Sequence, residues 1–169
     1  MILDYERRNI IITVDIGFCK KDDFVQVLNV DATSPYAWPS SFLYNELFKK
    51  ENTTCIGAYS PLDNKLIGYG LLDISVKNSF IINLVVTREH RRKGIGSQIL
   101  IALSEVAQAC GSGKMSLRVR LNNTPAQSLY VMFGFVGDEI IPDYYHDGES
   151  ALLMSALLPL IIPEDLHSY

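Results

Sequence analysis

The hydrophobic positions of the chain change period several times along its length. Runs rich in β-branched and aromatic residues predict strands, because such side chains fit a pleated, half-buried surface. The expected strands cover residues 9–19, 54–59, 65–76, 79–86, 115–120, 135–141 and 150–156. The run 79–86 (SFIINLVV) is almost wholly apolar, which predicts a strand that is buried on both faces.

Apolar residues spaced three and four apart predict helices between these strands. The expected helices cover residues 22–29, 40–50, 97–110 and 124–133. Gly111 supplies a stop for the third helix, and Thr124, Pro125 and Gln127 predict an N-cap, a proline at the first helical position and a capping-box glutamine. The alternation of strands and helices predicts a mixed α/β domain with a central sheet of about seven strands.

Composition limits the class of protein. A chain of 169 residues, 48% hydrophobic and 20% charged, predicts a single globular domain over residues 1–169. Its net charge of −4 argues against nucleic-acid binding. The apolar run ALLMSALLPLII is too short to span a bilayer and contains Pro159, and the N-terminus carries charges where a signal peptide needs apolar residues. We therefore expect a cytoplasmic protein with no membrane partner.

The cysteines and histidines do not form a recognisable metal or disulfide pattern. Three cysteines, far apart and without CxxC spacing, favour buried thiols in a reducing compartment. The histidines are scattered, so no metal site is expected; they are His90, His146 and His167.

The stretch REHRRKGIGSQIL, residues 88–100, carries the first candidate chemistry. It joins the apolar strand to the helix, and it places cations and glycines where the first backbone N–H groups of a helix lack internal partners. Glycines allow a phosphate to approach the backbone, and arginines can bind its oxygens, so the stretch predicts a diphosphate site. A solvated charge cluster is the alternative. The stretch is not a Walker loop, because no glycine stands at the required position upstream of Gly94. It is not a dinucleotide fingerprint either, because Ile99 stands where GxGxxG needs its third glycine.

The spacing Arg91-x-x-Gly94-x-Gly96 resembles the acetyl-coenzyme A motif of the GNAT acetyltransferase superfamily, and within it the ribosomal-protein alanine N-acetyltransferase branch. Two later blocks strengthen the likeness, LRVRLNNTPAQSLYVMFGF at 117–135 and YYHDGESALLM at 144–154. The resemblance implies the GNAT fold, with a mostly antiparallel sheet of about seven strands, a splayed strand pair and about four flanking helices. It also implies acetyl-coenzyme A as the acetyl donor and no metal.

The resemblance further implies site residues. A backbone amide at Val85 or Val86 would stabilise the charge on the thioester oxygen, and Tyr130 would protonate the departing thiolate. The residues implied to bind the coenzyme are Leu84, Val85, Val86, Arg91, Arg92, Lys93, Gly94, Ile95, Gly96, Ser97, Asn123 and Tyr130. The residues expected at the acceptor are Trp38, Asn83, Arg118, Tyr144 and Tyr145.

Several of these residues have a purely structural alternative. Asn123 could cap the helix that follows it, and Tyr130 could be a core aromatic beside Phe133. Tyr144 and Tyr145 could be ordinary hairpin aromatics, and Trp38 a packing anchor. The acidic residues Asp143, Asp147 and Glu149 could form a solvated turn or attract a cationic acceptor.

Arg118 departs from the pattern of the branch. A glutamate that is thought to take the proton of the amine occupies this position in the branch, and arginine cannot act as a base. At pH 7 an α-amine is about 10% neutral and a lysine roughly 0.04%, so an α-amine tolerates the loss of a base better. We therefore hypothesise that the acceptor is an α-amine. Arg118 could pair with an acidic residue near the start of an acceptor peptide. Alternatively, Arg118 swings away to a surface carboxylate.

Three functions remain open from the sequence. The favoured one is an acetyl-coenzyme A-dependent N-acetyltransferase acting on a protein or peptide N-terminus. The others are acetylation of a small-molecule amine, such as a polyamine, amino acid or drug, and a non-catalytic acetyl-coenzyme A-binding module. The sequence does not distinguish a monomer from a homodimer, nor acetyl from other acyl donors.

Overall fold

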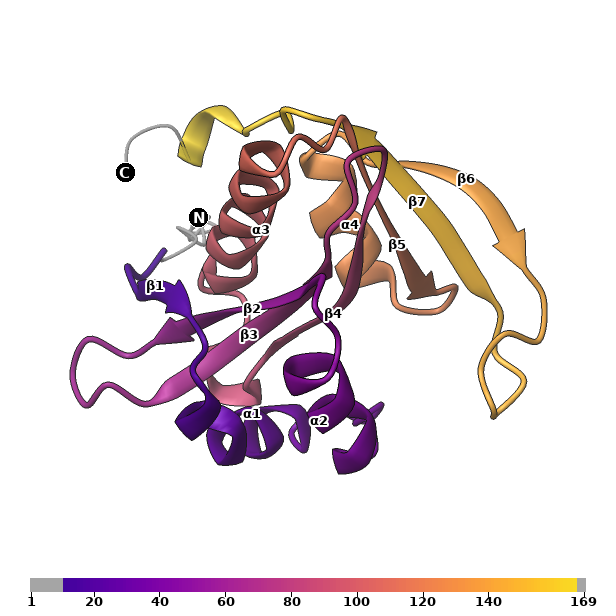
Figure 1. Cartoon of the computed structure of the whole chain (residues 1–169). Helices are drawn as coiled ribbons and strands as arrows, with labels where there is room; N and C mark the ends of the chain where they lie inside the picture. Colours follow the sequence, from indigo (N-terminus) through magenta and orange to yellow (C-terminus); the bar gives the residue numbers. More distant parts are fainter. Residues whose placement is uncertain (1–10, 167–169) are drawn as a thin grey trace, which may run out of the picture.

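A seven-stranded sheet forms the centre of the molecule in the computed structural model, which describes residues 11–166 (Figure 1). The strands follow the order β1-β2-β3-β4-β5-β7-β6, and β4 and β5 are parallel while the other neighbours are antiparallel. The strands are β1 (Asp15–Phe18), β2 (Thr53–Tyr59), β3 (Leu66–Asp73), β4 (Ser79–Val86), β5 (Lys114–Arg120), β6 (Val136–Ile141) and β7 (Ala151–Leu157). The predicted mostly antiparallel sheet of about seven strands is confirmed.

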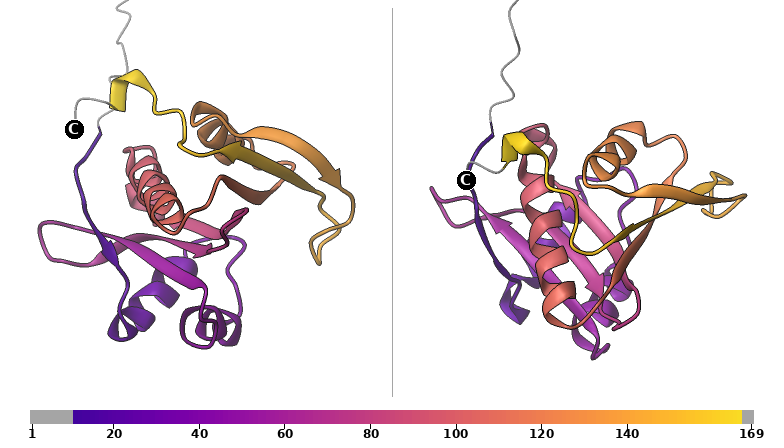
Figure 2. Two further views of the ribbon diagram at one scale, coloured as in Figure 1. Left: turned by 45° about the horizontal axis from the view of Figure 1, so that its top comes forward. Right: turned by 90° about the horizontal axis from the view of Figure 1, so that it is seen from above.

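Four α-helices flank the sheet, as expected. They are α1 (Phe24–Asp31), α2 (Ser40–Phe48), α3 (Ile95–Ala109) and α4 (Thr124–Met132), with short 3-10 turns at Lys21–Asp23, Arg88–His90 and Glu164–Leu166. Helices α1 and α2 lie on one face of the sheet and α3 on the other, with α4 next to the second half of the sheet (Figures 1 and 2). Two hydrophobic clusters follow from this arrangement, one centred on α3 and one beneath α1 and α2.

Strands β4 and β5 separate soon after they meet. They pair at Ser79 with Met115, Phe80 with Ser116 and Ile81 with Leu117, and then each continues without the other. Against β3, Leu71 pairs with Asn83 and Leu72 with Ile81, so Ile82 is an extra residue in a β-bulge. Because a bulge bends its strand, it helps to turn β4 away from β5. The result is a wedge-shaped opening in the middle of the sheet.

The opening changes the burial of β4. We predicted a strand buried on both faces, but only Ser79, Ile81 and Val85 are buried. The other five residues are partly exposed, and four of them, Ile82, Asn83, Leu84 and Val86, lie in the part of β4 that β5 has left. The prediction of full burial was therefore wrong, for a reason that lies in strand pairing.

Several element boundaries differ from prediction; the strand 65–76 is shorter, at Leu66–Asp73, and the helices 22–29 and 40–50 lie at Phe24–Asp31 and Ser40–Phe48. The first strand begins at Asp15 and not at residue 9, residues 11–14 are not in a strand, and residues 9 and 10 lie outside the described part. Helix α3 begins at Ile95, two residues early, because Gly94 takes the N-cap position. Helix α4 is capped by Asn123 and not by Thr124, since its Oδ1 accepts the Ala126 N–H at 3.3 Å.

The cysteines and the C-terminal segment were also open points. Cys55 is buried and Cys19 partly buried, but Cys110 is exposed after α3, so the expectation of buried thiols was wrong for Cys110.

In the C-terminal segment, Leu160 packs into the core of its own chain. Within residues 11–166 no helix has the length and apolar character needed to cross a membrane.

Candidate active site

The first turn of α3 and the loop before it have the geometry of a backbone site for an anion. Gly94 has φ +76°, and a Cβ at this position would lie 2.9 Å from Ile11 Cγ2, so glycine satisfies both the turn and the close approach. Inside the helix the first N–H to donate is that of Gln98, to the Gly94 carbonyl at 3.2 Å. The N–H groups of Ile95, Gly96 and Ser97 therefore point out of the helix end, where its dipole favours negative charge.

The cations of this loop mostly hold the loop itself. Arg91 Nε donates to the Val86 carbonyl at 2.9 Å, and Lys93 Nζ donates to the Glu89 carbonyl at 2.8 Å. Arg92 is exposed and has φ +62°, an uncommon conformation for a residue with a side chain. The helix end thus offers backbone N–H groups as its direct contacts, and the three cations add positive charge to the loop before it.

The second half of β4 lines the opening with peptide groups. Thr87 N–H donates to the Ile67 carbonyl on the β3 side at 2.9 Å, so alternation turns the Val85 N–H to β3 as well. The N–H groups of Leu84 and Val86 then face the opening. Asn83 Oδ1 accepts the Leu84 N–H at 3.1 Å, so that group is engaged. Of the predicted pair, Val85 and Val86, Val86 is the better candidate for an amide at a thioester oxygen, because the Val85 N–H faces β3.

Asn83 belongs to a buried polar network beneath the opening. Its Nδ2 donates to Tyr69 Oη at 2.8 Å and to Asp31 Oδ1 at 3.1 Å. Asp31 also accepts the Tyr69 hydroxyl and the Trp38 N–H, each at 2.7 Å. The amide of Asn83 is therefore engaged inside the protein, where it fixes the α1–α2 connection to the sheet.

Tyr130 projects from α4 into the core beside the opening. Its side chain is 7% exposed, and its ring centroid lies 5.6 Å from that of Phe135. Burial, and then the neighbouring Tyr145, raise the pKa of Tyr130 above its ordinary value. The hydroxyl is therefore protonated at neutral pH and can act as a proton donor.

A groove of about 390 Å³ lies on the α2 side of the opening, between the α1–α2 connection and the β6–β7 turn. Aromatic and apolar walls surround charged side chains in it. Its lining residues are Trp38, Phe42, Glu46, Lys50, Asp73, Phe80, Ile82, Arg118, Tyr144 and Tyr145. Four of the five predicted acceptor residues thus lie in one groove, and the fifth, Asn83, is not among its lining residues.

Arg118 is held at the groove and not on a surface carboxylate. Its Cζ lies 4.8 Å from the Phe80 ring centroid and 5.3 Å from that of Tyr144, and Nη1 is 3.4 Å from Tyr144 Oη. No ion pair to Arg118 occurs within residues 11–166. The cation is thus available to an acidic group that enters the groove.

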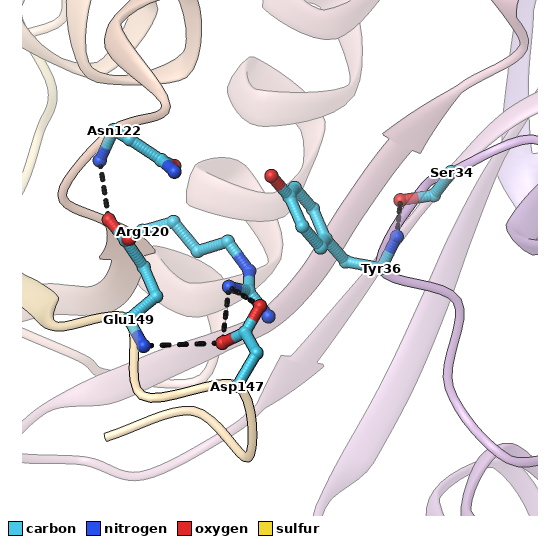
Figure 3. A network of polar contacts seen from close by, with 6 residues as sticks. All are labelled: Ser34, Tyr36, Arg120, Asn122, Asp147 and Glu149. Carbon is cyan, nitrogen blue, oxygen red and sulfur yellow. Dashed lines mark hydrogen bonds and ion pairs between the residues drawn. The ribbon is translucent and has the colours of Figure 1, made fainter. Parts of the chain in front are cut away.

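Arg120, two residues later, has a structural role (Figure 3). Its Cζ lies 3.9 Å from the Tyr36 ring centroid and 4.0 Å from that of Tyr145, and its Nη1 contacts both Asp147 carboxylate oxygens. Glu149 Oε1 in turn accepts the Asn122 N–H at 3.0 Å. These contacts join the α1–α2 connection, β5 and the β6–β7 turn, and they engage two of the acidic turn residues.

Sequence reasoning missed Glu46. This α2 residue is 3% exposed and lines the groove, with Oε1 2.6 Å from Lys50 Nζ. The available signal was a glutamate within the apolar stripe of a predicted helix, four residues before a lysine. Within the described residues, no group of three or more histidine, cysteine or acidic side chains could hold a metal.

Comparison with known proteins agrees with this geometry. The model of the acetyltransferase (GNAT) family matches residues 22–135. A Bacillus subtilis (strain 168) protein is 32% identical over 137 residues, covering 79% of this chain and 88% of its own; its name provisionally assigns it to the ribosomal protein bS18-alanine N-acetyltransferases. The N-alpha-acetyltransferase of Sulfurisphaera tokodaii is 27% identical over 150 residues, covering 80% and 88%.

A solved structure supports the same assignment at the level of the fold. The ribosomal-protein-S18-alanine N-acetyltransferase of Escherichia coli superposes with a TM-score of 0.79 at 20% identity, covering 92% of this chain and 99% of its own. With its splayed β4 and β5 and its matched residues 22–135, this chain belongs to the GNAT acetyltransferase family.

Proposed function

We propose that the protein transfers an acetyl group from acetyl-coenzyme A to the α-amino group of a protein or peptide N-terminus. One observation carries this proposal: β4 connects two sites. Phe80 and Ile82 line the groove, and Val86 leads into the basic loop and the anion site of α3. A diphosphate at the helix end and an amine in the groove would meet along the opened half of β4.

The residues of this chain have separate tasks in the transfer. The N–H groups of Ile95, Gly96 and Ser97 bind the diphosphate, and the Val86 N–H stabilises negative charge on the thioester oxygen. Acetyl-coenzyme A supplies a thioester carbonyl. The neutral amine attacks the carbonyl carbon, the carbon–sulfur bond breaks as the carbon–nitrogen bond forms, and the proton that the nitrogen loses passes to water. Tyr130 gives its hydroxyl proton to the departing thiolate and regains one from solvent.

The acceptor assignment rests on proton chemistry and on the relatives. Arg118 cannot take a proton from the amine, so an acceptor that is partly neutral at pH 7 reacts more readily than a lysine. The names of the relatives from Bacillus subtilis and Sulfurisphaera tokodaii refer to alanine and to α-amino acetylation. A cytoplasmic location and a monomeric or homodimeric state remain parts of this proposal.

Mass spectrometry of acetyl transfer tests the proposal. The acceptors are peptides beginning with Ala, Ser, Met or Asp, the same peptides with blocked N-termini plus one lysine, and several polyamines. The proposal expects acetylation of free N-termini. Transfer only to polyamines would assign a small-molecule acceptor, and binding of acetyl-coenzyme A without any product would leave a non-catalytic binding module.

A further inference from the structure

Glu46 is a buried carboxylate at a position where helix stability does not favour one. It lies in the last turn of α2, which ends at Phe48, and the C-terminal end of a helix dipole disfavours negative charge. Its surroundings are largely aromatic, since Trp38 and Phe42 stack at 4.4 Å in the same groove. Burying a charged group is costly unless it is paired, so its partners decide its role.

Lys50 contacts only one of the two carboxylate oxygens of Glu46. The ammonium lies 2.6 Å from Oε1, and the lysine side chain itself is 55% exposed. Oε2 is buried and has no hydrogen-bond partner within residues 11–166. A purely structural ion pair would explain the contact at Oε1 but not the unpartnered oxygen of a residue that lines the groove, because such an oxygen loses the hydrogen bonds that water would give it.

The groove also needs a group for the acceptor as it arrives. An α-amine is about 90% protonated at pH 7, so the acceptor enters mostly as an ammonium ion. Arg118 repels this ion, and the groove carboxylates Glu46 and Asp73 attract it. Of these two, Glu46 is the more deeply buried and the one with an unpartnered buried oxygen.

Building on the proposed function, we propose that Glu46 is the acceptor-binding carboxylate of the groove, and that a small turn of its side chain presents the unpartnered Oε2 to the ammonium group of the incoming N-terminus. Lys50 holds the other oxygen and so fixes the orientation of the carboxylate. Arg118 carries the opposite charge in the same groove and is available to an acidic side chain of the acceptor. Together they select an N-terminus that carries both charges.

Glu46→Gln tests the inference, because glutamine keeps the shape and removes the charge. The expected result is a rise of about ten- to a hundredfold in the acceptor KM, the effect of one charged hydrogen bond, with the KM for acetyl-coenzyme A unchanged. Glu51→Gln, an exposed neighbour outside the groove, is the matched control. An acceptor KM of Glu46→Gln equal to that of the control would overturn the inference.

Lys50→Gln separates acceptor binding from a structural ion pair. Both variants break the pair and should lower the melting temperature, but Lys50→Gln keeps the carboxylate. Its acceptor KM should therefore rise much less than that of Glu46→Gln. Equal increases in the two variants would mean that the pair acts only through the fold.

Direct binding gives a readout that does not depend on turnover. In the presence of coenzyme A, calorimetry compares an alanine-initiated peptide with its N-acetylated form. The native protein should prefer the free amine, and Glu46→Gln should lose most of this preference. If the variant keeps the native preference while the native protein acetylates peptides, the inference fails and the proposed function stands. If the native protein acetylates no peptide and shows no such preference, both fail.

Discussion

Arg120 and Asp147 tie the β6–β7 turn to β5, with Nη1 of the arginine 3.0 Å and 2.8 Å from the two carboxylate oxygens. The same guanidinium lies between the rings of Tyr36 and Tyr145. Tyr145 also lines the groove, so this contact controls the position of one groove wall. The ion pair therefore connects the turn with one wall of the groove.

The first prediction concerns the pH dependence of this contact. Hydrogen bonds from Arg120, and then from the Glu149 backbone N–H, lower the pKa of Asp147 below its ordinary value. Stability from such a group is fully present above the unfolded pKa of about 3.9 and is lost as pH falls through the folded pKa. The difference in melting temperature between native protein and Asp147→Asn should therefore shrink below about pH 4. Asp143→Asn is the control, and a difference that is constant with pH would refute the prediction.

The second prediction concerns the anchor of the α1–α2 connection. Asp31→Ala removes the acceptor for the Trp38 N–H and the Tyr69 hydroxyl, and leaves buried polar groups unpaired. We expect a loss of about 3 kcal/mol or more in the free energy of unfolding, measured by urea denaturation. Asp22→Ala, at an exposed site near α1, should change it by less than about 0.5 kcal/mol. Similar values for the two variants would contradict the network.

The third prediction separates the two glycines of the anion site. A Cβ at Gly96 would lie 3.4 Å from Leu129 Cδ2, which is ordinary contact, so Gly96→Ala should fold normally. Because the methyl group lies in the first turn of α3, it should weaken acetyl-coenzyme A binding, measured by calorimetry. Gly94→Ala should also lower the melting temperature, because of its positive φ and the contact with Ile11. Native affinity in Gly96→Ala would argue against the helix end as the diphosphate site.

The fourth prediction concerns the charge of Arg118. If its guanidinium pairs with an acidic acceptor residue, Arg118→Glu should remove any preference for peptides with an early Asp or Glu. Arg118→Met keeps much of the packing on Phe80 and Tyr144 without charge, and should give an intermediate preference. Competition between acidic and neutral peptides measures this preference. Unchanged selectivity in both variants would remove Arg118 from acceptor recognition.

The sequence predicted the elements better than the contacts between them. Periodicity located every strand and helix approximately, because both periods are local properties of the chain. Thr124 as N-cap was wrong, and the alternative that Asn123 caps this helix is confirmed; both residue types cap helices well, and only the structure distinguishes them. The direction of the Val85 amide depends on strand pairing next to the bulge at Ile82, which no local pattern revealed.

The candidate site was predictable only where a motif marked it. The glycine loop, Tyr130 and the tyrosine pair stand in recognisable stretches. Arg118 and Arg120 stand two residues apart on β5, so strand alternation puts them on one face, but their different roles arise from Phe80 and Asp147, which are distant in sequence. The role of Glu46 depends on a groove that α2, β4, β5 and the β6–β7 turn form together.

The most direct test of the account is the turnover of Tyr130→Phe on the best N-terminal peptide, with acetyl-coenzyme A saturating. Phenylalanine keeps the buried ring beside Phe135 and removes the proton that the thiolate would take. The account predicts that kcat falls by about 10²- to 10⁴-fold, while coenzyme affinity and melting temperature stay near the native values. Native kcat in Tyr130→Phe would contradict the assignment of the acid.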